Sequence, residues 1–146
     1  MSLQDILRTK GTRVLSIAPS ATLADVVQKL VNNNCGSLVV CEEENPCRMV
    51  GIITERDILR ACAARKAPLE HLRVIEVMSR ELITGSPNES VQDAMGQMTR
   101  HRIRHLPVVD DGDGHLIGIV SIGDLVKNQY DQLSMENHYL KTYIQG

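Results

Sequence analysis

The stretch Gly118-Ile119-Val120-Ser121-Ile122-Gly123-Asp124-Leu125 decides the fold, because the chain contains it twice. The earlier copy, Gly51-Ile52-Ile53-Thr54-Glu55-Arg56-Asp57-Ile58, has the same order of glycine, two β-branched residues, a hydroxyl residue, aspartate and an aliphatic residue. This order predicts a buried strand that runs directly into a helix, with the hydroxyl capping the helix and the aspartate three residues later. Such a turn directs free backbone N–H groups outward beside a hydroxyl and a carboxylate, a combination that can hold a sugar and a phosphate.

Helix capping alone explains either copy taken by itself, since a hydroxyl residue followed by an acid is a common helix start. The rest of the sequence favours a duplication. Pro19 and Asp25 recur 68 residues later as Pro87 and Asp93, and the glycine and aspartate of the motif recur after 67. We interpret this pattern as two tandem copies of one unit, with short insertions or deletions in the loops.

Each unit predicts the order β-α-β-β-α, an α/β fold. In the first unit Thr22 caps a helix with Asp25 in the capping-box position, and Asn32-Asn33-Asn34 ends it. The second helix of that unit is predicted at 55–65, and the helices of the second unit at 90–101 and from Ile122 onward. The predicted strands are 14–17, 37–41 and 49–54 in the first unit, and 82–84, 105–109 and 116–120 in the second.

The chain therefore divides into repeat one at 1–66, a linker at 67–73, repeat two at 74–128 and a C-terminal helical tail at 129–146. We predict that the last helix runs on through the tail, because an imperfect apolar stripe continues along it. We expect the tail to pack back on the repeats or against another subunit. The residues of the stripe are Leu125, Tyr130, Leu133, Leu140, Tyr143 and Ile144.

Composition excludes several classes of protein. The 146 residues carry a formal net charge of −2, with no Trp, no Phe and three Tyr near the C-terminus. This argues against a general polyanion binder and against base stacking on aromatic side chains. The four cysteines form no CxxC pair, the N-terminus has no signal-peptide pattern, and no apolar run reaches about 18 residues. We expect an intracellular, cytoplasmic protein that does not span a membrane.

Metal binding has weak support in the sequence. Zinc-ligand atoms are offered by Cys41, Cys47 and His115, but the spacing of these residues matches no standard zinc site. The turn at 110–114 superficially resembles a calcium loop, yet Ser121 falls where the bidentate glutamate belongs. We expect a solvated hairpin turn and no metal.

The duplicated unit and its motif resemble the cystathionine-β-synthase (CBS) domain pair, over nearly the whole chain from Leu3 to Lys127. The resemblance rests on the two motif copies, on the Val74-x-x-Val77-Met78 segment, which Leu3-x-x-Ile6-Leu7 echoes, and on the strand 106–110. It implies adenosine-containing ligands (AMP, ADP, ATP, NAD or S-adenosylmethionine) in one or two clefts between the repeats. It also implies flat, disc-like homodimers formed through the helices.

The resemblance further implies roles for individual residues. Asp57 and Asp124 would bind ribose hydroxyls, while Thr54 and Ser121 would reach ribose or phosphate. One cleft would combine Asp57 with residues of repeat two and with two residues near the adenine, which are Arg104, His105, Val77 and Met78. The other would combine Asp124 with residues before the middle strand of repeat one and with the N-terminal segment, which are Cys35, Gly36, Ile6, Leu7, Lys10, Gly11 and Thr12.

The charges make the two predicted clefts unequal. Three Arg and two His lie within residues 100–105, and helix-dipole complementation explains the first of them, Arg100 and His101. Arg104 and His105 are close enough to the strand to meet a phosphate, whereas the matching residues of repeat one are uncharged. We therefore predict that the Asp57 cleft prefers a phosphorylated ligand, and that phosphates at the Asp124 cleft reach Lys10 or Arg13.

The sequence fits four classes of function to different degrees. A ligand-sensing regulatory module that signals to a separate, unidentified protein fits the motifs best. A structural dimerisation module with vestigial clefts is the main alternative. An enzyme is disfavoured because the sequence has no P-loop, GxGxxG, HExxH or nucleophile elbow. Nucleic-acid binding through residues 100–105 is disfavoured by the acidic net charge.

Overall fold

The computed structural model describes residues 1–46 and 48–145. Repeat one contains β1 (Ser16–Ile17), α2 (Leu23–Asn33), β2 (Ser37–Cys41), β3 (Met49–Thr54) and α3 (Glu55–Ala64). Its sheet has the order β1-β2-β3, with β1 parallel and β3 antiparallel to β2. The predicted strands 37–41 and 49–54 and the cap at Thr22 are confirmed, and the first strand is shorter than predicted.

Repeat two contains α5 (Val91–His101), β4 (His105–Val109), β5 (Leu116–Ser121) and α6 (Ile122–Gln145). β4 and β5 pair antiparallel, as β2 and β3 do in repeat one. The predicted strand at 82–84 is wrong. Within the part of the chain that the structure describes, this edge forms a single bridge, Gly85 to Val108, with Gly85 N donating to Pro107 O and Val109 N donating to Gly85 O.

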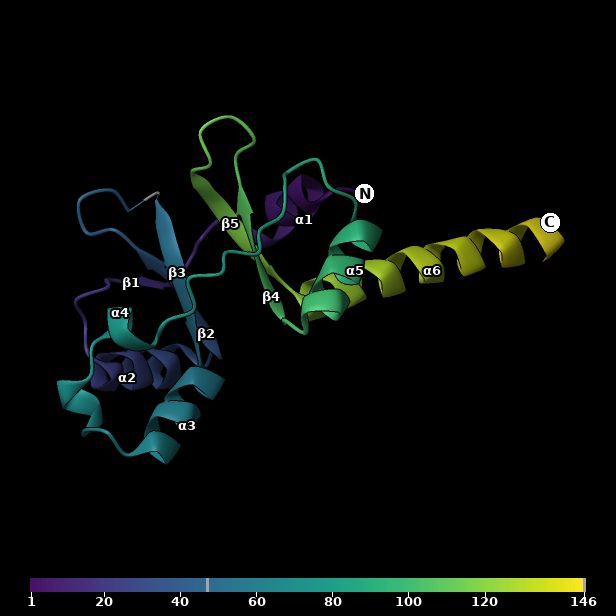
Figure 1. Ribbon diagram of the computed structural model, residues 1–146. Coiled ribbons are helices and arrows are strands. Elements are labelled where there is room, and N and C mark those ends of the chain that lie inside the picture. The colour runs from purple at the N-terminus through teal and green to yellow at the C-terminus, as the bar shows by residue number, and fades with distance from the viewer. Residues whose placement is uncertain (47, 146) are drawn as a thin grey trace.

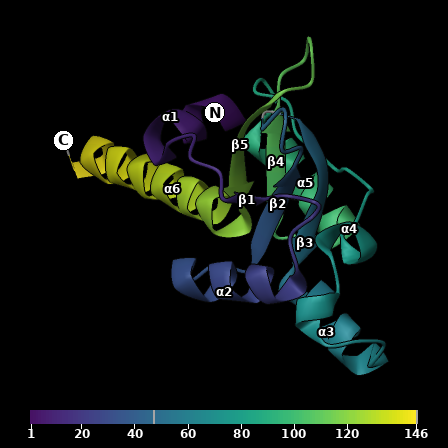
Figure 2. The same cartoon turned by 90° about the vertical axis from the view of Figure 1, so that its left-hand side faces the viewer.

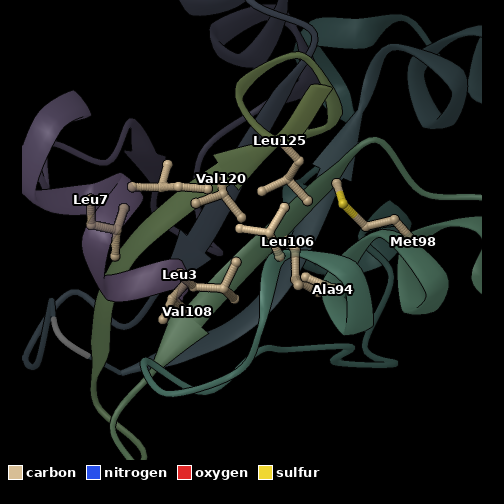
Figure 3. Packing of buried hydrophobic residues seen from close by; sticks show 10 residues of the cluster. Leu3, Leu7, Ala94, Met98, Leu106, Val108, Val120 and Leu125 are labelled. Carbon is tan, nitrogen blue, oxygen red and sulfur yellow. The ribbon is translucent and has the colours of Figure 1, made fainter. Parts of the chain in front are cut away.

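Two short helices, α1 (Leu3–Lys10) and α4 (Val74–Val77), cross over between the repeats. α4, which follows the 3-10 turn η1 (Leu69–His71), packs on repeat one, since Val74 N donates to Ala21 O and Val74 is buried in the core of that repeat. α1 packs on repeat two, since Leu3 N donates to Glu89 O and Leu3 is fully buried. Figure 3 shows Leu3 and Leu7 in one cluster with residues of α5, β4, β5 and α6, which are Ala94, Met98, Leu106, Val108, Val120 and Leu125.

The sheets of the two repeats are neighbours (Figures 1 and 2), and side chains from both form a small apolar cluster. Every residue of β2 is buried, because alternate side chains point to opposite faces and both faces are covered. Leu38 and Val40 enter the core of repeat one, whereas Val39 packs with Leu116 and Ile119 of repeat two. The two motif strands, β3 and β5, therefore belong to sheets in direct contact.

The motif glycines make room for the short helices. A Cβ on Gly51 would lie 2.6 Å from Met78 Sδ and 2.9 Å from the backbone oxygen of Ser79. A Cβ on Gly118 would lie 2.9 Å from Leu7 Cδ2. Each glycine thus allows α4 or α1 to sit close against the motif strand, which explains why the motif begins with this residue.

α6 runs 24 residues, and its last turns extend away from the rest of the chain in both views (Figures 1 and 2). The expectation that the tail packs back on the repeats is wrong within one chain, because Tyr130, Leu133, Leu140 and Ile144 are exposed. Its other alternative, packing against another subunit, stays a prediction. Among the described residues no helix is apolar enough to cross a membrane.

Candidate functional site

Both motif carboxylates cap their own helices. Thr54 N donates to Asp57 Oδ2 at 2.9 Å and Asp57 N donates to Thr54 Oγ1 at 3.4 Å, which is a reciprocal capping box. Ser121 N donates to Asp124 Oδ2 at 2.8 Å and Asp124 N to Ser121 Oγ at 3.1 Å. Each cap uses Oδ2, and within the described ranges Oδ1 of neither aspartate accepts a hydrogen bond. Because both aspartates are half-buried, these second oxygens can accept hydroxyl donors without uncapping the helix.

Lys10 makes the second helix start different from the first. Its Nζ donates to Asp124 Oδ2 at 2.6 Å and to Ile119 O at 2.9 Å. Burial alone would raise the pKa of Asp124, but the hydrogen bonds from Lys10 and Ser121 outweigh it and hold that pKa below its usual value. The Asp124 carboxylate is therefore ionised and paired with the Lys10 ammonium group. The same ammonium group would contact the phosphate of a ligand bound at this helix start.

The first helix start is bordered by Gly36 and an acid. Glu55 N donates to Gly36 O at 3.0 Å, and a Cβ on Gly36 would clash with Glu55 Oε1. No salt bridge to Asp57 is formed by the residues that the structure describes. A cavity of about 480 Å³ adjoins this start between α2 and α3, lined by Cys35, Gly36, Glu55, Ile58 and apolar residues of the two helices.

His105 lies beside the helix start of the second motif. It pairs with Ser121 across the sheet, and the next residue back, Arg104, accepts a hydrogen bond from Ile122 N at 2.8 Å. Burial, Lys10 and Arg104 lower the pKa of His105, while Asp124 and Glu55 oppose them. Because Glu55 belongs to the first motif, His105 senses charges of both repeats. Its lowered pKa keeps the imidazole largely neutral near pH 7, and a neutral imidazole can donate from one nitrogen and accept at the other.

The pH dependence of stability should report this environment. The folded pKa of His105 lies below the 6.5 of an exposed histidine, so the unfolded chain binds the proton first as pH falls. Stability from neutral His105 is therefore present above about pH 6.5 and is lost as pH falls through the folded pKa. In urea unfolding measured between about pH 8 and pH 5, His105→Gln should flatten this loss. His101→Gln, at an exposed histidine, should not, and equal profiles for both variants would contradict the assigned surroundings.

The remaining predicted residues divide by repeat. Met78 contacts Gly51 of the first motif strand and Val77 packs on the same core, so both lie on the side of Asp57. Leu7 contacts Gly118 and Ile6 lies in the second core, with Gly11 and Thr12 exposed just beyond Lys10. Within the described residues no hydrogen bond or ion pair joins Cys35 or Gly36 to the Asp124 motif, and their role in that cleft stays a prediction.

Sequence reasoning missed Glu55. It occupies a variable position of the motif, where the second copy has Ile122, so the comparison of the two copies gave it no weight. The available signal was the extra acid at the start of the first helix. The structure places this acid near enough to influence His105 of the other repeat.

The residues considered as zinc ligands, Cys41, Cys47 and His115, lie in different parts of the chain. Cys41 is buried in the contact between the repeats, and Cys47 lies outside the described residues. His115 Nδ1 lies 2.5 Å from Asp113 Oδ1 in the turn between β4 and β5. Asp110 Oδ2 accepts from the backbone N–H groups of Gly112 and Asp113, which agrees with a solvated hairpin turn.

Comparisons with known proteins settle the family. The family model of the CBS domain matches residues 3–64 and 74–131. The chain belongs to the CBS domain family. Its α/β architecture is that of a CBS domain pair, as solved structures of such pairs show by their similarity.

Three relatives define this similarity. CBS domain-containing protein CBSX3, mitochondrial, of Arabidopsis thaliana is 36% identical over 151 residues, covering 99% of this chain and 72% of that protein. CBS domain protein PAE2072 from Pyrobaculum aerophilum, complexed with AMP, is 34% identical, with a TM-score of 0.74 over 85% of this chain and 89% of that one. The CBS domain pair of protein MJ0100, in complex with 5′-methylthioadenosine and S-adenosyl-L-methionine, is 28% identical, with a TM-score of 0.75 over 90% of this chain and 98% of that one.

Proposed function

We propose that this chain is a regulatory module that binds an adenosine-containing ligand between its two CBS repeats and signals the bound state to a separate protein. The single observation that carries the proposal is the pair of helix-capping aspartates, Asp57 and Asp124. Each uses Oδ2 for the cap and can offer Oδ1 to a ribose hydroxyl. The complexes of PAE2072 with AMP and of MJ0100 with two adenosine compounds support the ligand class. AMP, ADP, ATP, NAD and S-adenosylmethionine are the candidates.

The charges support a phosphorylated ligand. Lys10, Arg104 and His105 lie about the helix start at Ser121, and helix N-termini favour anions. Arg104 would contact a phosphate in bidentate fashion, and an anion beside His105 would raise the pKa of that imidazole and draw in a proton. The preference of the Asp57 cleft over the Asp124 cleft for such a ligand remains part of the proposal.

The proposed role is not catalytic. The aspartates of the site are held as helix caps, and the proposed chemistry is reversible binding that favours one arrangement of the repeats. A homodimer and a cytoplasmic location belong to the same proposal. The alternative, a dimerisation module with vestigial clefts, is supported by Lys10, whose ammonium group already pairs with the carboxylate of Asp124.

A thermal-shift screen separates these two functions. Each compound is added separately to the purified chain, and any compound that binds should raise the melting temperature. The compounds are AMP, ADP, ATP, NAD and S-adenosylmethionine. A ligand at a hundredfold excess over its Kd should stabilise the fold by about 2.7 kcal/mol. Adenine-free ribose 5-phosphate is the control for nonspecific anion binding. If none of the five adenosine compounds shifts the melting temperature, the vestigial module is the correct description.

A further inference from the structure

The C-terminal part of α6 carries an apolar face that its own chain leaves uncovered. Val126, Tyr130, Leu133, Leu140 and Ile144 are 51%, 69%, 61%, 59% and 80% exposed. These fractions are large for apolar side chains in regular helix, and both views show the last turns standing apart from the two repeats (Figures 1 and 2).

The spacing of these residues is regular. From Val126 the intervals alternate four and three residues through Tyr130, Leu133, Asn137, Leu140 and Ile144. We call these six residues the tail seam. Alternation of four and three is the heptad repeat that brings two helices together along a supercoil. The only polar member is Asn137, and it falls at an a position when Leu133 and Leu140 are placed at d.

We propose that the tail seam packs against the tail seam of a second copy of this chain as a short, parallel, two-stranded coiled coil. The inference deepens the homodimer of the proposed function and is independent of ligand binding. In a parallel pair the two Asn137 side chains meet and can hydrogen-bond each other, whereas an antiparallel pair would set each against an apolar side chain. A single asparagine at an a position also favours two strands and fixes their register.

Charge complementarity identifies the second copy as the occupant. Glu136 lies at g, immediately before Asn137, and Lys141 lies at e, immediately after Leu140. In a parallel pair the g residue of one helix faces the e residue of the next heptad on the other helix, so Glu136 of each chain meets Lys141 of the other. The same seam therefore supplies both members of two symmetric ion pairs.

The seam is short, which decides how it must be tested. It spans 19 residues, about 27 Å at 1.5 Å per residue, which is fewer than three heptads. The full chain is therefore the right material, since the first turns of α6 are anchored by Leu125 in the core of repeat two. Substitutions in the exposed part leave that core intact.

Sedimentation equilibrium of the full chain tests the seam directly. The unchanged chain should be a dimer and Leu133→Glu should be a monomer, with unchanged circular dichroism. Met135→Glu, at an exposed f position facing away from the seam, should stay a dimer. A monomeric unchanged chain overturns the proposal, and so does a Leu133→Glu variant that dimerises as tightly as the unchanged chain.

A charge exchange tests the parallel direction. Glu136→Lys and Lys141→Glu should each weaken self-association by about three- to thirtyfold, because two exposed ion pairs become two like-charge pairs. Mixing the two variants should restore association, since every pair across the seam is then of opposite sign. Failure of the mixture to associate better than either variant alone overturns the parallel seam, whatever the thermal-shift screen gives for the ligand.

Discussion

Asp57→Ala and Asp124→Ala are each expected to weaken binding of the adenosine ligand by about ten- to a hundredfold at one of the two clefts. The estimate is the loss of one hydrogen bond between a charged carboxylate and a ribose hydroxyl, about 1.5–3 kcal/mol. The double variant should have no measurable binding in the range where the unchanged chain saturates. Isothermal titration calorimetry gives both the affinity and the number of sites.

Each substitution also removes a helix cap, so a matched control is needed. Asp25 caps α2 from the same capping-box position, with Thr22 N donating to Asp25 Oδ2 at 3.0 Å, but it lies outside the duplicated motif. Asp25→Ala should cost about 1 kcal/mol of stability, as the other two do, and should leave ligand affinity unchanged. Full-affinity binding by the double variant would mean that the aspartates act only as caps.

Gly51→Ala should destabilise the fold by about 1–3 kcal/mol, the usual range for overpacking a filled site. The added Cβ meets Met78 Sδ at 2.6 Å and the backbone oxygen of Ser79 at 2.9 Å, and the backbone atom cannot move aside without disturbing its hydrogen bond to Ile52 N. Gly118→Ala should cost less, because its contacts are the terminal methyl carbons of Leu7. Urea denaturation measures both.

At a third glycine, substitution by alanine should raise the stability of the fold. Gly96 lies exposed within α5, where an added Cβ meets nothing within 4 Å. Gly96→Ala should therefore stabilise the chain by about 0.5–1 kcal/mol through helix propensity. If Gly51→Ala were as harmless as Gly96→Ala, the close packing of the Met78 segment against β3 would be refuted.

Most of the local structure followed from short-range patterns. The strand-to-helix turns at Thr54 and Ser121 were predictable because a β-branched pair, a hydroxyl and an acid act within a few residues of one another. The strand at 82–84 was predicted by analogy with repeat one and did not form, since its edge retains backbone pairing only at Gly85. An apolar segment forms a strand only where a neighbouring strand offers backbone groups for pairing.

The candidate site was predictable only in part. The resemblance brought Lys10 near Asp124, but the 2.6 Å bond between them depends on α1 lying against repeat two. The influence of Glu55 on His105 was not predictable from either copy of the motif. Both features join residues that are distant in the chain, and no local pattern encodes such distances.

The sequence by itself determined the duplication, the helix caps and the apolar stripe of the tail, because each of these depends on residue types at particular intervals along the chain. Only the tertiary structure decided that α1 crosses to the core of repeat two and that α4 crosses to the core of repeat one. The physical reason is that this exchange depends on which core can bury Leu3, Leu7 and Val74, and that in turn depends on the room left above Gly118 and Gly51 once the sheets have formed.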